Sequence, residues 1–214
     1  MHEPEPPPPL LVRDWLAARS IARGLPAPVE DRGGWRVETG LPTETRRYVF
    51  ASVSEGLQGA AQTISSPLIF LKLCGSSAAM RAVVPVRWQV HEGGHFMTFE
   101  GGASAAARPP AGYVIEMSES GDAITARILT RDGALAASGF AARANGVFIY
   151  DRIATQAAHR RRGLGSAILG ALASKRRPAD TRQALVATEE GRLLYARLGW
   201  VVRSPWTTAV IDSA

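Results

Sequence analysis

Apolar residues recur along the chain with two spacings, every three or four residues as in helices and every second residue as in strands. These spacings divide the chain into predicted helices and strands. In the amino-terminal half, apolar residues at helical spacing end at Gly24, just before Pro26, and Ser54 stands where a helix cap is expected. Helices are therefore predicted over residues 10–24, 54–66 and 76–84. Short apolar runs predict strands over residues 33–40, 46–51 and 67–73, followed by a hairpin of residues 86–90 and 95–99.

The carboxy-terminal half follows residues 101–111, a stretch rich in Gly, Ala, Ser and Pro that is typical of a linker. Four alternating segments then predict an antiparallel meander with tight turns at Gly121-Asp122, Asp132-Gly133 and Asn145-Gly146. The meander strands are expected over residues 113–118, 123–130, 135–142 and 147–154. The remaining elements are expected to be a helix over 163–175, a strand over 184–187, a helix over 191–198 and one or two strands over 201–211.

This order of elements predicts an α/β (α+β) fold, with a mixed, mostly antiparallel sheet flanked by helices. The expected organisation is a disordered tail at residues 1–9, an amino-terminal α/β half at residues 10–100, the linker, and a carboxy-terminal core at residues 112–214. The proline-rich, acidic start lacks the basic and apolar regions of a secretory signal.

Composition narrows the class of protein. The chain has 214 residues, of which 46% are apolar, but no apolar run approaches the ~20 residues that a membrane-spanning helix needs. The single cysteine, Cys74, cannot form an internal disulfide, so a reducing cytoplasm is the expected compartment and no membrane partner is expected. The net charge of +6 favours anionic partners, whereas no basic groove with interleaved aromatic residues points to nucleic acid.

The strongest candidate for chemistry is the turn between the strand 147–154 and the helix 163–175. The turn Arg160-Arg161-Arg162-Gly163-Leu164-Gly165-Ser166 places unpaired amides at a helix amino terminus, where the helix dipole favours anions. Its two glycines leave room for a pyrophosphate, and its arginines add positive charge. A P-loop would need Gly-Lys-Ser/Thr, and a dinucleotide fingerprint would need Gly or Ala in place of Ile168. The turn therefore predicts a phosphate site of another kind.

The motif Arg160-x-x-Gly163-x-Gly165 resembles the R/Q-x-x-G-x-G/A signature of the GNAT superfamily, the N-acetyltransferases that use acetyl-coenzyme A. Downstream, Leu194-Tyr195-Ala196-Arg197-Leu198-Gly199-Trp200 resembles that family's L-Y-x-x-L-G-F ending. The resemblance implies acetyl-coenzyme A as acyl donor, without a metal, and a strand 147–154 that splays from its neighbour and binds the pantetheine arm. The implied cofactor-binding residues are Ile153, Ala154, Thr155, Arg160, Arg161, Arg162, Gly163, Leu164, Gly165, Ser166 and Thr188.

By the same resemblance, Tyr195 is the general acid that reprotonates the leaving thiolate of coenzyme A. A phenol with a reference pKa of ~10 suits this task, and simple packing beside Leu194 and Leu198 is the alternative role. The acceptor amine must also lose a proton. Asp151 and Glu116 are the candidate bases, Glu189 is a weaker one, and a chain of water molecules could replace them.

Two departures from the family pattern concern the cofactor and the acceptor. Thr188 stands where the family often has Asn. Only Ser120-Gly121-Asp122 separates the first two strands of the carboxy-terminal half, where the usual fold inserts two helices that shape the acceptor pocket. The amino-terminal half repeats the order strand, helix, strand, helix, which predicts either a degenerate GNAT-like repeat that supplies acceptor-site walls or an unrelated α/β extension.

The segment His91-Glu92-Gly93-Gly94-His95 matches the zinc-peptidase motif H-E-x-x-H, in which two His ligands lie one helical turn apart. Two glycines would cost such a helix about 2 kcal/mol relative to alanine, and both flanks have the pattern of strands. We therefore expect a hairpin turn here and no zinc.

Together these patterns predict an acetyl-coenzyme A-dependent N-acetyltransferase that acts by direct attack of a primary amine. The acceptor is expected to be a small-molecule or peptide amine. GNAT proteins frequently pair through their final strands, so a homodimer is consistent with the resemblance. The alternative is a non-catalytic module that binds coenzyme A, or an anionic ligand such as nucleic acid, through the basic turn.

Overall fold

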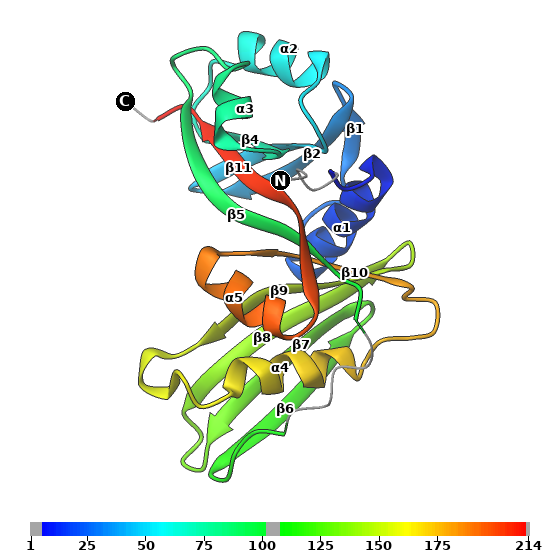
Figure 1. Ribbon diagram of the computed structural model, residues 1–214, viewed down its shortest axis with the longest axis vertical. Helices are drawn as coiled ribbons and strands as arrows, with labels where there is room; N and C mark the ends of the chain where they lie inside the picture. The colour runs from blue at the N-terminus through cyan, green and yellow to red at the C-terminus, as the bar shows by residue number, and fades with distance from the viewer. Residues whose placement is uncertain (1–5, 102–107, 213–214) are drawn as a thin grey trace.

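The computed structural model describes residues 6–101 and 108–212, and it contains one mixed sheet of eleven strands (Figure 1). The strand order is β1-β2-β3-β4-β11-β5-β10-β9-β8-β7-β6. The pair β3–β4 and the pair β9–β10 are parallel, and the other neighbours are antiparallel. The predicted fold class is therefore confirmed. None of the described helices is long and apolar enough to span a membrane.

Apart from the hairpin of residues 86–99, the amino-terminal half contains the helices and strands that its apolar pattern predicts, together with the short strand β1. Its elements are α1 (Pro9–Ala22), β1 (Val29–Asp31), β2 (Gly34–Leu41), β3 (Glu44–Phe50), α2 (Glu55–Thr63), β4 (Ile69–Cys74), α3 (Ser77–Arg81) and β5 (Gln89–Phe99). The predicted cap is present, because the Leu57 amide donates to Ser54 Oγ at 3.2 Å.

The start of α1 differs from the expected disordered tail at residues 1–9. Pro9 is the first residue of the helix, a position where the missing amide hydrogen of proline costs nothing, and the Leu11 amide donates to the Pro8 carbonyl at 2.9 Å. Pro7 is buried. The rest of the predicted tail, residues 1–5, and residues 102–107 of the predicted linker lie outside the described residues.

The predicted hairpin of residues 86–99 is wrong, because β5 is one continuous strand. Trp206 of β11 (Trp200–Val210) lies opposite Gly94 and Thr207 lies opposite Glu92, so Gly93 is an extra residue in a β-bulge. Gly94 has a φ of +128°, and a Cβ atom there would lie 2.0 Å from the Ala187 carbonyl oxygen. The two glycines thus bend one strand instead of reversing the chain, and the H-E-x-x-H residues do not form a helix.

The carboxy-terminal half contains the predicted meander, and β11 is a single strand. The elements are β6 (Tyr113–Ser120), β7 (Ala123–Thr130), β8 (Leu135–Ala144), β9 (Val147–Thr155), the short 3-10 helix η1 (Ala157–His159), α4 (Leu164–Ala173), β10 (Arg182–Ala187), α5 (Glu189–Arg197) and β11. Asn145 and Gly146 both have positive φ, as the tight turn between β8 and β9 requires.

The two halves exchange their final strands. The last strand of the amino-terminal half, β5, pairs with β10, whereas the last strand of the carboxy-terminal half, β11, pairs with β4. The two exchanged strands also pair with each other along most of their length and run side by side between the upper and lower parts of the molecule in Figure 1. The halves therefore share one continuous sheet.

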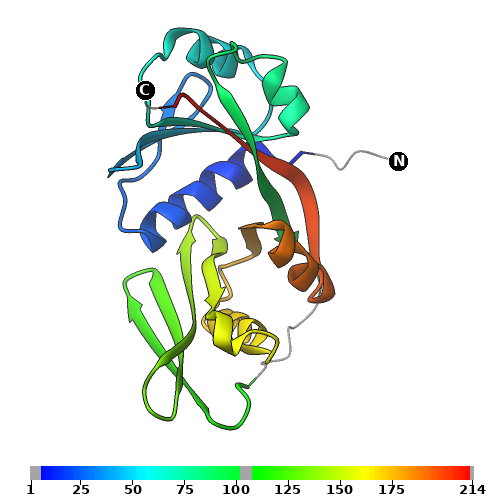
Figure 2. The same ribbon diagram turned by 90° about the vertical axis from the view of Figure 1, so that its left-hand side faces the viewer.

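Helices cover both faces of this sheet (Figure 2). Apolar residues of α4 and α5 pack with Phe148 and Tyr150 of β9 on one face, while Trp15 and Leu16 of α1 pack with Ile149 on the other. The helices α2 and α3 enclose a third cluster with β3 and β4. The helix α1 thus covers one face of β8 and β9.

Candidate active site

The site is built around a separation of two parallel strands. β9 pairs with β10 only where Val147–Ile149 lie opposite Arg182–Ala184, although β9 continues to Thr155 and β10 to Ala187. From Tyr150 onward, the edge of β9 that faces β10 has no ladder partner in the part of the chain that the structure describes. An extended ligand could therefore bind these free backbone groups.

A β-bulge in β9 shapes this edge. Arg152 and Ile153 together lie opposite Gly139 of β8, and Arg152 has a φ of +51°. A Cβ atom at Gly139 would lie 2.5 Å from Ile153 Cδ1, so glycine is needed where Ile153 crosses β8 toward α4. The bulge points Asp151 and Arg152 toward α1, where the Arg152 guanidinium donates to the Ala22 carbonyl at 2.7 Å.

The turn after β9 presents unpaired amides, as predicted. Arg161 and Gly163 have φ values of +62° and +76°, and Gly163 is the N-cap of α4 without a side-chain cap. The first amide of this helix with a backbone partner is that of Ala167, which donates to Gly163 at 3.1 Å. Within the described residues, the amides of Leu164, Gly165 and Ser166 have no recorded acceptor, so they are available to an anion.

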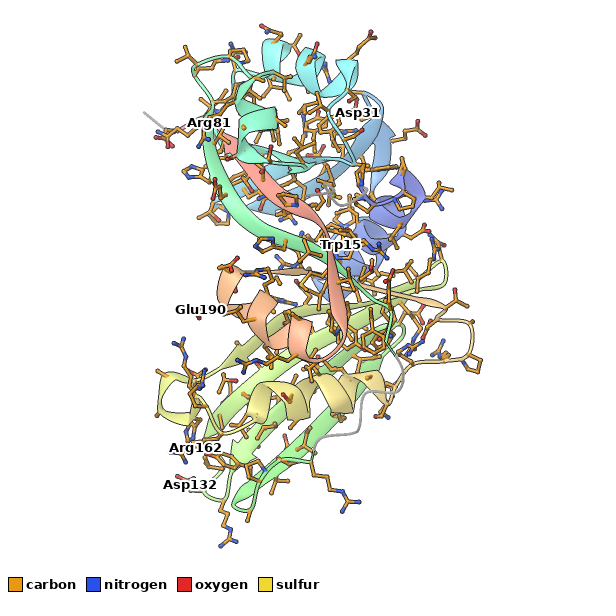
Figure 3. All side chains as sticks on the ribbon, in the orientation of Figure 1. Trp15, Asp31, Arg81, Asp132, Arg162 and Glu190 are labelled. Carbon is orange, nitrogen blue, oxygen red and sulfur yellow. The ribbon has the colours of Figure 1, made fainter. Side chains whose placement is uncertain are left out.

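Aromatic and basic side chains fix the conformation of this turn. The Tyr113 hydroxyl, from β6, lies 2.9 Å from His159 Nδ1 and accepts a hydrogen bond of 3.1 Å from Arg162. Figure 3 labels Arg162 and Asp132, a residue of the β7–β8 turn, at the same end of the molecule. Arg160, Arg161 and Arg162 are exposed, so their guanidinium groups can contact a ligand.

Several predicted cofactor-binding residues meet at the start of α4. A Cβ atom at Gly165 would lie 4.0 Å from Thr155 Oγ1 and 3.4 Å from Leu194 Cδ2, which are ordinary contact distances. The end of β9, with Ala154 and Thr155, therefore lies against both the phosphate turn and α5. Thr188 is the N-cap of α5, where its hydroxyl accepts from the Gly191 amide at 3.2 Å.

Tyr195 lies on the face of α5 that packs against the sheet. Its side chain is 8% exposed and its ring centroid lies 6.0 Å from that of Trp200. Burial, with a smaller contribution from Asp151, raises the pKa of Tyr195 to about 12. The hydroxyl therefore holds its proton at neutral pH.

The three candidate bases lie in different places and have different partners. Asp151 faces α1, where its two carboxylate oxygens accept hydrogen bonds of 2.6 and 2.9 Å from Arg23. Glu116 is exposed on β6, three strands away from β9, so the structure does not bring it to the site. Glu189 begins α5 and pairs with Arg192 and His95, and hydrogen bonds from these two residues lower its pKa to about 2.

A cavity of about 290 Å³ opens on the α1 face where β9 and β10 separate. It extends from Tyr150 and Ala187 at the separated strands to residues that the sequence patterns did not identify. Those residues are Trp15, Arg19 and Arg23 of α1, Lys72 of β4, and Trp206 and Thr208 of β11. The only sequence signal among them was Lys72, a lone charge within an otherwise apolar strand.

The chain was compared with known families, curated proteins and solved structures. No family model and no curated protein matches the sequence. A GCN5-related N-acetyltransferase from Kribbella flavida matches with a TM-score of 0.64 and 16% identity, over 93% of this chain and 96% of that one. A GNAT-family protein from Novosphingobium aromaticivorans matches with a TM-score of 0.59 and 16% identity, over 97% of this chain and all of that one.

A functionally unknown conserved protein from Staphylococcus epidermidis also matches, with a TM-score of 0.60 and 12% identity over 87% of this chain and 93% of that one. At such identities the likeness concerns the fold, and function has to be argued from the site. The splayed strands β9 and β10 and these structural matches together show that the chain has the fold of the GNAT superfamily, the GCN5-related N-acetyltransferases.

Proposed function

We propose that the protein is an acetyl-coenzyme A-dependent N-acetyltransferase that acts on a primary amine. The observation that carries this proposal is the free edge of β9, which leads from the unpaired amides at the start of α4 to the separation of β9 and β10. The cavity on the α1 face begins at that separation, and Tyr195 of α5 packs on the other face of the sheet. In the proposed function, acetyl-coenzyme A would extend from the amides of α4 along this backbone edge toward both.

The residues present fit coenzyme A. Gly163 and Gly165 keep the start of α4 free of side chains, and the amides of Leu164, Gly165 and Ser166 would bind the pyrophosphate with help from Arg160, Arg161 and Arg162. The backbone of Ile153, Ala154 and Thr155 would bind the pantetheine arm. We assign no cofactor contact to the Thr188 hydroxyl, because it caps α5.

When bound, acetyl-coenzyme A would supply an activated acetyl thioester, whose transfer to an amine releases a thiolate that needs a proton. Tyr195 keeps its proton throughout the physiological range, because burial raises its pKa to about 12. Its hydroxyl is therefore suited to donate rather than to accept a proton. This supports the general-acid role over simple packing.

We do not assign the base to Asp151, although it lies at the cavity. Both of its carboxylate oxygens already accept from Arg23, and Arg152 Nε lies 3.3 Å away, so Asp151 is better suited to hold α1 against β9. Glu116 is too distant from the separated strands to contribute. The proton of the attacking amine would then leave through water in the cavity.

We also propose that the amino-terminal half is a degenerate GNAT-like repeat. Both halves run in the same order of meander, helix, parallel strand, helix and exchanged strand. Between β3 and α2, the chain has Ala51 to Ser54 without an R-x-x-G-x-G motif, so this copy would lack a phosphate site. The contribution of this half to the site would instead be walls of the cavity, formed by α1 and Lys72.

Calorimetric titration with acetyl-coenzyme A, followed by an assay of thiol release with a panel of amines, tests the enzymatic function. We expect saturable binding with a micromolar dissociation constant and thiol release that requires an amine. Binding without turnover across all amine classes would support the non-catalytic coenzyme A module, and absence of binding would contradict both.

A further inference from the structure

The cavity on the α1 face has polar walls of unusual composition. Its cationic side chains come from three elements: Arg19 and Arg23 from α1, Lys72 from β4 and Arg152 from β9. Its single carboxylate is that of Asp151. The edges of Trp15 and Trp206, whose ring centroids are 5.1 Å apart, contribute an apolar side. Such a site combines one broad apolar surface with a concentration of positive charge.

The positive charge around this cavity exceeds the negative charge even when the nearby buried pair is included. Behind Lys72, Glu44 forms two hydrogen bonds of 2.7 Å with Arg47, so these two side chains neutralise each other. Asp151 binds Arg23 directly and lies 3.9 Å from Arg19 and 3.3 Å from Arg152. The carboxylate of Asp151 therefore forms ion pairs with three arginines, and no carboxylate that lines the cavity pairs with Lys72.

Arg19 and Lys72 each have N–H groups that donate no hydrogen bond to the described part of the chain. The Arg19 side chain is 17% exposed, yet no hydrogen bond from its guanidinium is recorded within residues 6–101 and 108–212. Lys72 Nζ donates one hydrogen bond, to Thr208 Oγ1 at 3.0 Å, and has two further donors. Donors of partly buried cations need an acceptor, which is either water or the anionic group of a ligand, and an anion also balances their charge.

We infer that the acceptor is a small amine that also carries a carboxylate or phosphate, and that Arg19 and Lys72 bind this anionic group. The inference rests on the proposed function for the identity of the cavity as the acceptor site. A guanidinium and an ammonium on opposite walls suit either anion. The cavity of about 290 Å³ has room for an acceptor of roughly the size of an amino acid.

The position of the anion determines where the amine lies. Arg19 and Lys72 come from α1 and β4, and Arg19 Nε lies 3.9 Å from an oxygen of Asp151, the residue after Tyr150 on β9. An acceptor anchored by these two cations would therefore hold its amine within the same cavity, near the proposed path of the acyl donor. Asp151 and Arg23 would keep α1 in place.

Equilibrium binding to matched amines tests this inference without requiring turnover. The pairs are β-alanine with propylamine and O-phosphoethanolamine with ethanolamine, titrated by calorimetry into the full-length protein in the presence of coenzyme A. We expect at least one anionic member to bind about tenfold or more tightly than its neutral partner, and the preferred pair identifies the anion. Equal or weaker binding of both anionic members would overturn the inference.

Substitutions of Arg19 and Lys72 test whether these two side chains cause the preference for the anionic amine. Arg19→Gln and Lys72→Met should each reduce the preference for the anionic member about tenfold, whereas Arg127→Gln, an exposed charge on β7 outside the cavity, should leave it unchanged. An unaltered preference in both cavity variants would contradict this site. If anionic amines bind but no amine is acetylated, the inference holds and the proposed enzymatic function fails. If neutral amines are the better acetyl acceptors, the function holds and the inference fails.

Discussion

Tyr195 has one property that a proton donor needs, a retained proton. Its ring is held between α5 and the sheet, and a Cβ atom at Gly191 would lie 3.2 Å from Tyr195 Cε2. Burial is the main cause of its raised pKa of about 12, and the negative charge of Asp151 adds to it. The hydroxyl therefore stays protonated well above neutral pH.

Tyr195→Phe should lower kcat about 100-fold, because proton transfer by a positioned side chain contributes roughly that much. The dissociation constant of acetyl-coenzyme A should change less than about twofold, since the phenylalanine ring keeps the packing against Trp200. Steady-state kinetics and calorimetry on the same preparation measure both quantities. An unchanged kcat would reduce Tyr195 to a packing residue.

Lys72 is the second residue whose surroundings alter its chemistry. Burial lowers its pKa to about 8, and the positive charges of Arg47 and Arg23 act in the same direction, while Glu44 acts against them. Its remaining neighbours are Thr208, which accepts its hydrogen bond, and the ring of Phe70. Lys72 is therefore charged at neutral pH and loses that charge as the pH rises through about 8.

Anion binding at the cavity should weaken as the pH rises from about 7 to 9, because the lowered pKa of Lys72 removes a positive charge in that range. Propionate, which has no amine to titrate, is the probe, and its dissociation constant is measured by competition with the preferred acceptor. Lys72→Arg should abolish the pH dependence, because arginine stays protonated. A slope that persists in this variant would assign the titration to another group.

At the scale of elements, α4 is the helix whose first turn would bind the pyrophosphate in the proposed function. Gly163 reverses the chain with a positive φ, and Gly165 follows in the first turn with ordinary space for a methyl group. This difference separates two kinds of substitution. A side chain at position 163 would strain the turn, whereas a side chain at position 165 would project toward the ligand and toward Thr155.

Gly165→Ala and Gly165→Asp form a matched pair on α4. We expect the alanine variant to fold and to bind acetyl-coenzyme A within about tenfold of the parent protein, since its Cβ atom meets Leu194 at 3.4 Å. The aspartate variant should also fold, because a negative charge suits a helix amino terminus, but it should weaken binding about 100-fold by repelling the pyrophosphate. Equal affinities of the two variants would remove this turn from the site.

The helix α1 has a structural role of a different kind. Buried Asp14 accepts hydrogen bonds from Asn145 Nδ2 at 3.1 Å and from Arg182 at 2.9 Å, which join α1 to the β8–β9 turn and to β10. At the other end of the helix, Arg23 binds Asp151 of β9. An amino-terminal helix is thereby fixed across the carboxy-terminal strands, where it completes the cavity.

At the scale of the whole molecule, the exchanged strands make the two halves dependent on each other. Without β11, β4 would have an unpaired edge, and without β5, β10 would keep only its short pairing with β9. Buried Trp206 of β11 also packs against Trp15 of α1, at a ring distance of 5.1 Å. Neither half can complete its core or its site alone.

Residues 1–104 and 105–214, produced separately, should therefore lack a cooperative thermal transition, because each exposes an apolar strand edge. When the two fragments are co-expressed, they should associate and recover the binding of acetyl-coenzyme A. Circular dichroism and size-exclusion chromatography measure folding and association. A carboxy-terminal fragment that folds and binds the ligand by itself would show that the exchange is dispensable.

Much of the secondary structure could be predicted because it depends on local causes. The helix α2 follows its Ser54 cap, and the meander follows its alternating pattern and its Asn145-Gly146 turn. The phosphate turn was also predictable, since a strand, a glycine-rich turn and an apolar helix are contiguous in sequence. The same local reasoning failed at Gly93-Gly94, where paired glycines permit either a hairpin or a bulge and the partner strand decides.

The sequence by itself determined most of the elements, the glycine-rich turn of Arg160–Gly165 and the identity of Tyr195 as a candidate acid, because each depends on residues within one or two turns of chain. Only the tertiary structure decided which strands are exchanged. It also decided that Arg23 is hydrogen-bonded to Asp151 and that Arg19 and Lys72 line the same cavity. These features join residues from distant parts of the chain. Long-range strand pairing and the packing of α1 bring them together, and no local pattern encodes that pairing.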